Sequence, residues 1–198
     1  MNNLIDSFGR IHTYLRISIT DRCNLRCTYC MPYEGIKWKE KKEILTFEEI
    51  TRIAKLLVTM GVEKIRITGG EPTVRKNIEE LIQKLAVIPG LKTLAMTTNG
   101  IGFKEKAFTL KDKGLNSINI SLDTLKKDRF LKISKRDKLN EVLEGINAAL
   151  LAGYSSVKLN VVIMAGVNDD EIIDFVKFVK DKPINVRFIE FMPFKGNN

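Results

Sequence analysis

Six short runs of the sequence are rich in apolar residues that favour β-strands, and most of them alternate between apolar and polar positions, which is the period of a β-strand. In the first run, for example, Leu15, Ile17 and Ile19 alternate with Arg16 and Ser18, and five of the six runs share this alternation. The six predicted strands are residues 15–20, 64–68, 93–98, 117–121, 157–163 and 185–191.

Segments with helical spacing of apolar residues lie between most of these strands. Thr46 and Glu49 match the Thr-x-x-Glu pattern of a capping box, which predicts a helix that continues to Gly61. Asn168 and Glu171 predict a similar cap later in the chain. The other predicted helices are residues 78–85, 103–113 and 139–150, with a brief helical segment after residue 124.

This alternation of strands and helices predicts the fold class. Strands joined by helical crossovers run parallel, and repeated right-handed crossovers curl a sheet toward a barrel. We therefore predict an α/β fold, a partial (β/α)6 barrel of parallel strands formed by one domain over residues 1–198. A doubly wound open sheet is the alternative, but the sequence has no GxGxxG motif after its first strand.

The polar positions of the strands carry an unusual number of cations. If helices cover the apolar faces, the polar faces point into the barrel, where cations without partners are costly. Two or more phosphate groups would offset several converging cations, and arginine matches phosphate geometry. The alternative is that these residues lie on exposed edge strands and face water. The basic residues at these positions are Arg16, Arg66, Lys158 and Arg187.

Composition and charge limit the expected location and partners of the protein. The 198 residues are 44% hydrophobic, which suffices for a sizeable core, and contain no apolar run of membrane-spanning length and no signal-peptide pattern. We expect a cytoplasmic protein that binds no membrane. The net charge of +9 favours an anionic partner, although the basic runs at 104–113 and 126–138 resemble solvated helix faces.

All three cysteines lie within eight positions, as Cys23, Cys27 and Cys30, directly after the first predicted strand. Three thiolates can hold a metal and leave one coordination position open, and a β/α barrel places its chemistry in such loops. A structural zinc site completed by His12 and three simply buried cysteines are the alternatives.

A metal-stabilised nucleic-acid-binding module would also use clustered cysteines and a positive charge. Such a module would need a zinc-finger ligand pattern and an exposed stripe of basic and aromatic residues. The sequence lacks a zinc-finger ligand pattern. Phe103, Phe108 and Phe130 have the helical spacing of core residues, so we do not expect the stripe either.

The segment CNLRCTYC resembles the signature of the radical S-adenosylmethionine (radical SAM) superfamily. The resemblance implies that the three cysteines ligate three irons of one 4Fe-4S cluster and that SAM chelates the fourth. Reductive cleavage of SAM would then yield a 5′-deoxyadenosyl radical that abstracts hydrogen from a substrate. The segment TGGEP, which includes Gly70 and Glu71, resembles the motif that contacts the methionyl amine of SAM in this superfamily.

Further segments, including KIRITGGEPTVR, MTTNG, INISLDTL and RFIEFMPF, resemble the GTP 3′,8-cyclase family of molybdenum cofactor biosynthesis. This resemblance implies GTP as the substrate, a small redox protein as the reductant, and a homodimer as one oligomeric state. We also predict Arg187 in the GTP site, only because it lies at a polar position of its strand like Arg16, Arg66 and Lys158. The implied GTP-binding residues are Arg16, Arg66, Thr97 and Lys158, and the implied SAM-binding residues are Tyr29, Gly70, Ser121 and Met192, with Glu71 beside them.

The sequence departs from that family in one respect. Family members continue into a region with a second cysteine triad, whereas all three cysteines here belong to the first motif. We therefore expect a chain truncated after its sixth strand, either part of a longer cyclase or a short relative with altered activity. Another radical SAM enzyme, such as a peptide or tRNA modifier, remains the alternative activity.

Overall fold

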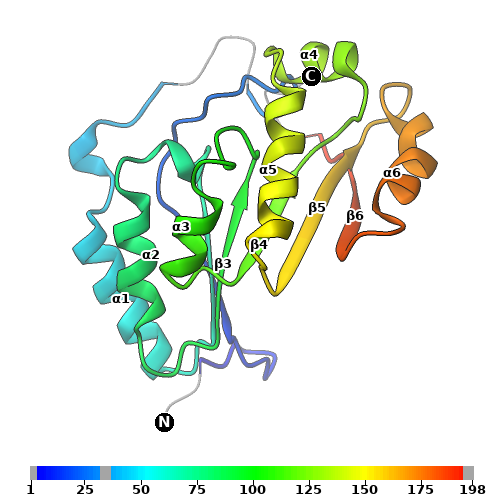
Figure 1. The fold of residues 1–198 in the computed structure, drawn as a ribbon. Helices are drawn as coiled ribbons and strands as arrows, with labels where there is room; N and C mark the ends of the chain where they lie inside the picture. The colour runs from blue at the N-terminus through cyan, green and yellow to red at the C-terminus, as the bar shows by residue number, and fades with distance from the viewer. Residues whose placement is uncertain (1–3, 32–36, 194–198) are drawn as a thin grey trace.

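The computed structural model describes residues 4–31 and 37–193 and contains one six-stranded parallel sheet (Figure 1). The strands follow one another in space in the same order as in sequence, which excludes the reversal of strand order of a doubly wound sheet. The predicted partial barrel is confirmed. Its strands are β1 (Tyr14–Ser18), β2 (Lys64–Thr68), β3 (Thr93–Thr98), β4 (Ser117–Ser121), β5 (Ser156–Ile163) and β6 (Ile184–Glu190).

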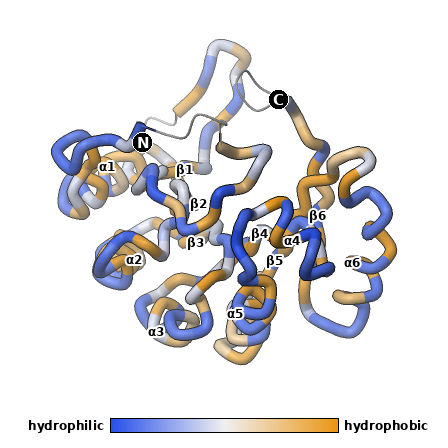
Figure 2. The backbone as a smooth tube through the Cα atoms, turned by 90° about the horizontal axis from the view of Figure 1, so that it is seen from above, coloured by the Kyte–Doolittle hydropathy of each residue, from blue (hydrophilic) through white to orange (hydrophobic). Residues whose placement is uncertain are grey.

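Helices follow the strands and cover the outer side of the sheet. Seen from above, the strands form an arc with α1, α2, α3, α5 and α6 outside it (Figure 2), whereas α4 lies above the ends of the strands (Figure 1). The α-helices are α1 (Phe47–Thr59), α2 (Ile78–Ala86), α3 (Ala107–Asp112), α4 (Lys127–Ser134), α5 (Leu139–Leu151) and α6 (Ile172–Val179). Short 3-10 helices span Lys41–Glu43, Pro72–Val74 and Asp169–Glu171.

The apolar positions of the strands form the core between the sheet and these helices. Ile65, Ile67, Ile118, Ile120 and Leu159 are fully buried there. Their polar neighbours consequently face the inner side of the arc, as the alternation predicts. No helix in the described part of the chain is long and apolar enough to cross a membrane.

The capping box at the start of α1 is confirmed. Thr46 Oγ1 accepts a hydrogen bond from the Glu49 N–H at 3.2 Å, and Glu49 Oε2 accepts one from the Thr46 N–H at 2.7 Å. The cap predicted from Asn168 and Glu171 is wrong. Both side chains are buried and hydrogen-bond to residues near the ends of β4 and β5 instead of closing the first turn of α6.

The helix predicted over residues 103–113 begins later, at Ala107, because the residues before it form turns closed by bonds between residues three apart, such as the Lys106 N–H to the Phe103 carbonyl at 3.0 Å. Phe103 and Phe130 are buried, but Phe108 is 53% exposed on α3, so its predicted core position is wrong.

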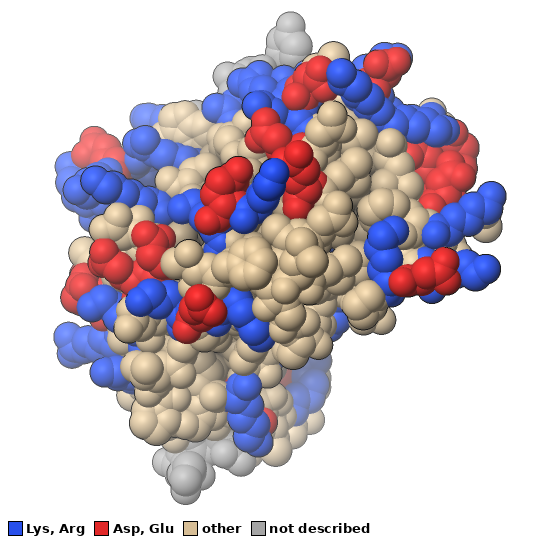
Figure 3. Space-filling model, in the orientation of Figure 1, with Lys and Arg blue, Asp and Glu red and all other residues tan. Residues whose placement is uncertain are grey.

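Acidic side chains accompany the basic runs on the helix surfaces (Figure 3). Lys104 pairs with Glu144, Lys127 with Asp137, and Lys138 with Glu141. This arrangement agrees with the interpretation of these runs as solvated helix faces.

Candidate functional site

The three cysteines line one cavity at the carboxyl ends of the strands. Cys23, Cys27 and Cys30 belong to the loop that leaves β1. The rest of the wall comes from other residues of this loop, from the ends of β2, β3 and β4 and the residues after them, and from α4. It comprises Leu25, Tyr29, Thr68, Gly69, Gly70, Thr97, Thr98, Asn99, Ser121, Asp123, Thr124, Phe130, Ile133 and Ser134.

Backbone hydrogen bonds on two sides fix the cysteine loop. On one side, the Gly70 N–H donates to the Thr20 carbonyl at 2.7 Å and the Glu71 N–H to the Arg22 carbonyl at 2.8 Å. On the other side, the Arg26 and Thr28 N–H groups donate to carbonyls at the end of α4, at 3.0 and 2.9 Å. The TGGEP segment and α4 therefore hold the cysteine loop between them.

The two glycines of TGGEP are required by this contact. A Cβ atom on Gly70 would lie 2.3 Å from the Arg22 carbonyl oxygen, and one on Gly69 would lie 2.5 Å from the Thr20 carbonyl oxygen. The sequence predicted a close approach of this backbone to a ligand. In the structure, the close approach is to the backbone of the cysteine loop itself, although both glycines also line the cavity.

Burial raises the pKa of all three thiols, and that of Cys27 to about 12. Nearby negative charge adds to this effect, because the carboxylate of Asp123 raises the pKa of Cys27 and Cys30 further. A metal centre would reverse this preference, since a bound cation stabilises thiolates.

The arrangement of the thiols distinguishes between kinds of metal centre. Within residues 4–31 and 37–193, no three His, Cys, Asp or Glu side chains are grouped closely enough to hold a single metal ion. An iron-sulfur cluster instead requires thiols spread around one cavity, because each thiolate binds a different iron. Three cysteines around a common cavity fit a 4Fe-4S cluster. His12 precedes β1 and contacts Asp6, so the structure does not bring it to the cysteines to complete a zinc site.

The half-buried Tyr29 and the buried Asp123 form a hydrogen-bonded pair in this cavity. Tyr29 Oη donates to Asp123 Oδ2 at 2.7 Å, and Asp123 Oδ1 accepts from the Val162 N–H at 2.9 Å. Burial raises the pKa of Asp123, while the hydrogen bond from Tyr29 opposes the rise. The sequence analysis did not select Asp123, although it follows Ser121 closely at the end of β4.

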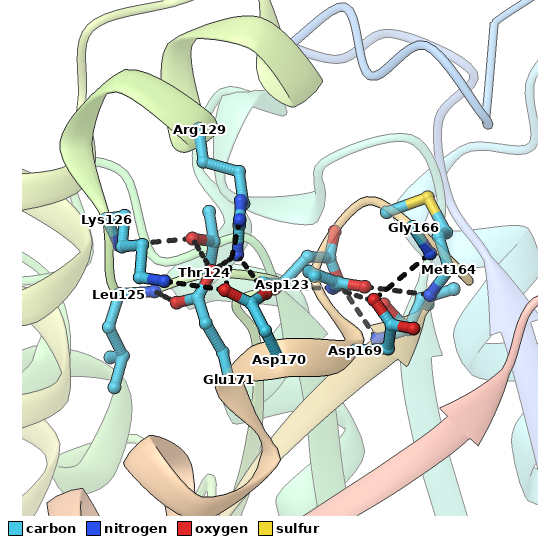
Figure 4. Close-up of polar contacts among 12 residues, drawn as sticks. Asp123, Thr124, Leu125, Lys126, Arg129, Met164, Gly166, Asp169, Asp170 and Glu171 are labelled. Carbon is cyan, nitrogen blue, oxygen red and sulfur yellow. Dashed lines mark hydrogen bonds and ion pairs between the residues drawn. The ribbon is translucent and has the colours of Figure 1, made fainter.

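Two buried polar residues support the segment that carries Asp123 (Figure 4). Asn168 Nδ2 donates to the Asp123 carbonyl at 2.7 Å and to the Val162 carbonyl at 2.8 Å. Glu171 accepts hydrogen bonds from Thr124 Oγ1 at 2.6 Å and from the Leu125 N–H at 2.8 Å. These contacts tie the loop after β4 to the segment after β5.

Arg129 of α4 joins the same network (Figure 4). Its guanidinium pairs with Glu171 and, at 2.6 Å, with Asp170, which also pairs with Lys126 at 2.8 Å. The basic partners hold the pKa of Asp170 far below its usual range. Since α4 covers the cysteine loop, this network links the cavity wall to the base of α6.

The Glu71 carboxylate does not face the cavity. It is fully buried and accepts hydrogen bonds from the Thr73 N–H, Thr73 Oγ1, Thr98 Oγ1 and the Asn99 N–H at 2.6 to 3.0 Å. With four donors already bound, this side chain joins the loops after β2 and β3. Any contact of TGGEP with a ligand in the cavity would come from Thr68, Gly69 and Gly70, which line it.

A basic face continues from the cavity along the inner side of the strands. Arg66 is only 4% exposed, and its Nε donates to Tyr14 Oη at 2.6 Å. The positive charges of Arg187, Lys64 and Arg66, together with burial, lower the pKa of Lys158. These basic residues are therefore close in space, as the strand parity predicts. Arg16 is the register partner of Arg66 but is exposed, as is Arg187, so this face is open to solvent rather than enclosed.

None of these basic side chains forms an ion pair with a carboxylate in the described part of the chain, whereas lysines on the outer helices do. Two amide oxygens on the same face, Asn119 Oδ1 and Asn160 Oδ1, are buried without a hydrogen-bond partner among the described residues. Asn119 is the register partner of both Thr97 and Lys158. The cations without carboxylate partners fit an anionic group on a ligand, and the unpaired amide oxygens, which can only accept, fit N–H or O–H donors on the same ligand.

Thr97 lies between the two halves of the site. It lines the cysteine cavity, and its Oγ1 accepts a hydrogen bond from Arg66 at 3.3 Å. Met192 is 70% exposed and is not part of the cavity wall, whereas its neighbour Phe191 makes an edge contact with the Tyr29 ring at 6.5 Å. The structure thus brings together all the predicted SAM-site residues except Met192 and the Glu71 carboxylate.

Comparisons with known proteins show which family this chain belongs to. The family model described as the radical SAM superfamily matches residues 17–179. The chain is 58% identical over 194 residues to the mitochondrial GTP 3′,8-cyclase of Arabidopsis thaliana, covering 98% of this chain and 50% of that protein. It is 54% identical over 188 residues to the GTP 3′,8-cyclase of Moorella thermoacetica, covering 95% of this chain and 58% of that protein.

The solved structure of Streptococcus suis SuiB bound to S-adenosylmethionine matches with a TM-score of 0.74 at 20% identity, over 93% of this chain and 42% of that one. At this identity the likeness shows the fold alone. The chain spans about half the length of the curated cyclases that it matches.

Proposed function

Because the chain belongs to the radical SAM superfamily, we propose that it carries the SAM-cleaving part of a GTP 3′,8-cyclase of molybdenum cofactor biosynthesis. The observation that carries the substrate assignment is the basic face beside the cysteine cavity. Its buried Arg66 and its Lys158 have no carboxylate partner among the described residues, so the charges of a triphosphate would offset them. The similarity to two GTP 3′,8-cyclases supports the same substrate.

In this proposal, Cys23, Cys27 and Cys30 each bind one iron of a 4Fe-4S cluster. When bound and reduced, the cluster supplies the electron that cleaves SAM and starts radical chemistry on the substrate. The backbone of Gly69 and Gly70 and the side chains of Tyr29 and Ser121 form the wall for SAM, and the exposed Met192 would have to approach it. Glu71 acts by holding these loops in place.

The proposed GTP site extends from the cavity along the basic face. Arg66, Lys158, Arg16 and Arg187 contact the phosphates, and Thr97 lies where the nucleotide would approach the cavity. The protein's contribution is to hold the nucleotide beside the SAM pocket and to neutralise its charge.

The partners of the protein and its organisation are also proposals. Residues 1–198 form a single domain, a small redox protein supplies the electron, and the working enzyme is a homodimer. Sedimentation of the reconstituted protein tests the last of these, because a monomer at micromolar concentration would contradict it.

Metal analysis and ligand titration test the proposed function. Protein reconstituted under anaerobic conditions should contain four irons and four acid-labile sulfides per chain, and titration calorimetry should detect SAM binding and GTP binding. Zinc without labile sulfide would contradict the cluster. Titration with ATP provides a control for unspecific attraction of phosphates, and an affinity for ATP equal to that for GTP would contradict a guanine-nucleotide substrate.

A further inference from the structure

Among the three thiols, only that of Cys23 receives a hydrogen bond from another residue's side chain within the described part of the chain. Asn99 Nδ2 lies 3.7 Å from Cys23 Sγ, and the Leu25 N–H donates to the same sulfur at 3.4 Å. Asn99 directly follows β3 and lines the cavity. Its side chain is not one of the groups that would bind SAM or GTP in the proposed function.

The orientation of the Asn99 amide is set by its other contacts. Asn99 Oδ1 accepts a hydrogen bond from the Ile101 N–H at 3.0 Å, and Asn99 Nδ2 donates to Asn24 Oδ1 at 2.7 Å. A flipped amide would place its NH2 group against the Ile101 N–H and its oxygen against Asn24 Oδ1. The remaining hydrogen on Nδ2 therefore points toward Cys23 Sγ.

The backbone of Asn99 is held equally firmly. Its N–H donates to Glu71 Oε2 at 2.6 Å, and the same buried carboxylate binds Thr98 Oγ1 at 2.8 Å. Glu71 therefore connects the TGGEP segment, through Asn99, to the first cysteine of the loop.

We propose that Asn99 raises the reduction potential of the cluster held by Cys23, Cys27 and Cys30, by donating a hydrogen bond to the Cys23 sulfur. An N–H donor withdraws electron density from a thiolate ligand and so stabilises the reduced cluster, which carries one more negative charge. This inference rests on the proposed function, because it requires the cluster.

The test compares wild type with Asn99→Asp and Asn99→Ala. Both variants keep the backbone N–H that binds Glu71, and both lose the Nδ2 donor. The midpoint potential is measured by redox titration followed by electron paramagnetic resonance, on samples with matched iron and sulfide content. We expect each variant to lower the equilibrium constant for reduction about tenfold, which is a fall of about 59 mV for a one-electron couple.

Asn116→Asp is the matched control. Asn116 Oδ1 accepts from the Leu94 N–H at 3.1 Å, just before β4 and therefore at the end of the sheet opposite the cysteines. The same chemical change at that position should leave the potential unchanged.

An unchanged potential in both Asn99 variants at full cluster content would overturn the inference. If the Asn99 variants lose the cluster, Asn24→Ala protein decides, with its asparagines labelled with 15N at the side-chain amide. The Ile101 N–H still orients the Asn99 amide in this variant, and the neighbouring labelled amide is gone. Pulsed electron paramagnetic resonance of its reduced cluster should detect coupling to the Asn99 side-chain nitrogen, and the absence of that coupling would overturn the inference. Failure of the wild-type protein to bind any cluster would instead overturn the proposed function.

Discussion

Tyr29 Oη donates a hydrogen bond to Asp123 Oδ2 at 2.7 Å and so joins the cysteine loop to the end of β4. The other oxygen of Asp123 is fixed by the Val162 N–H of β5, and its carbonyl by Asn168. The ring next to Cys30 is therefore oriented by residues from distant parts of the chain. This orientation follows from buried polar contacts rather than from the cysteine motif.

Replacement of Tyr29 by Phe should destabilise the cluster-free protein by about 1 to 3 kcal/mol, because it leaves a buried carboxylate oxygen without a donor. It should also raise the pKa of Asp123 further, since the Tyr29 hydrogen bond opposes the effect of burial. When the pKa of a carboxyl group is higher in the folded than in the unfolded state, the folded protein loses stability as the pH rises through the folded-state pKa. The loss should therefore be larger at pH 7 than near pH 4, as measured by urea unfolding.

Tyr154→Phe provides the control. Its buried hydroxyl donates to the Ala107 carbonyl at 2.8 Å, an acceptor that does not titrate. The loss of stability in this variant should be the same at both pH values. An equal pH dependence in the two variants would contradict the role assigned to Asp123.

Replacement of Gly70 by Ala should displace the cysteine loop, because the new Cβ would lie 2.3 Å from the Arg22 carbonyl oxygen. We expect a loss of about 1 to 3 kcal/mol, typical of overpacking, together with reduced cluster content after reconstitution. Gly166→Ala is the control. A Cβ atom at Gly166 would meet no atom within 4 Å, so this variant should lose stability only through backbone strain at its φ of +71°. Normal iron content in Gly70→Ala would contradict the packing argument.

Replacement of Arg66 by Ala should weaken GTP binding by about 10- to 100-fold, equivalent to about 1.5 to 3 kcal/mol for a hydrogen bond to a charged group. SAM binding should change far less. Lys113→Ala removes a half-buried lysine at the end of α3, which donates a hydrogen bond to Gln83 Oε1 at 3.0 Å, and should leave both affinities unchanged. Calorimetric titration of each ligand measures the difference, and an unaltered GTP affinity in Arg66→Ala would exclude the proposed phosphate site.

The affinity for GTP should fall at alkaline pH earlier than an ordinary lysine would allow. Burial and the charges of Arg187, Lys64 and Arg66 lower the pKa of Lys158, and only the protonated lysine attracts phosphate. The affinity should decrease as the pH rises through this lowered pKa. Lys158→Arg remains charged throughout the range and should remove that decrease, so the same alkaline loss in the variant would assign it to another group.

The sequence predicted the fold well because the period of two in the strands is set by burial on one side of each strand. All six strands lie within one residue of their expected start and the convergence of Arg66 and Lys158 followed from parity. Asn168 and Glu171 were misread as a cap because their partners, Asp123 and Thr124, lie more than 40 residues away.

Long-range contacts also explain what the motifs left out. The Glu71 carboxylate was expected near SAM, but the structure shows it binding Thr98 and the Asn99 N–H. Asn99 stood within MTTNG, and its contact with Cys23 crosses 76 positions of sequence. Periodicity cannot predict such pairs, because it reports only which face of an element is buried.

Formation of 5′-deoxyadenosine tests the central claim most directly. The reconstituted protein is incubated without oxygen with dithionite, SAM and GTP, and the products are analysed by mass spectrometry. The account predicts 5′-deoxyadenosine with the wild-type protein and none with Cys27→Ala. Absence of 5′-deoxyadenosine from wild-type protein with a verified 4Fe-4S cluster, or its undiminished formation by Cys27→Ala, would contradict the assignment of Cys23, Cys27 and Cys30 as the catalytic centre.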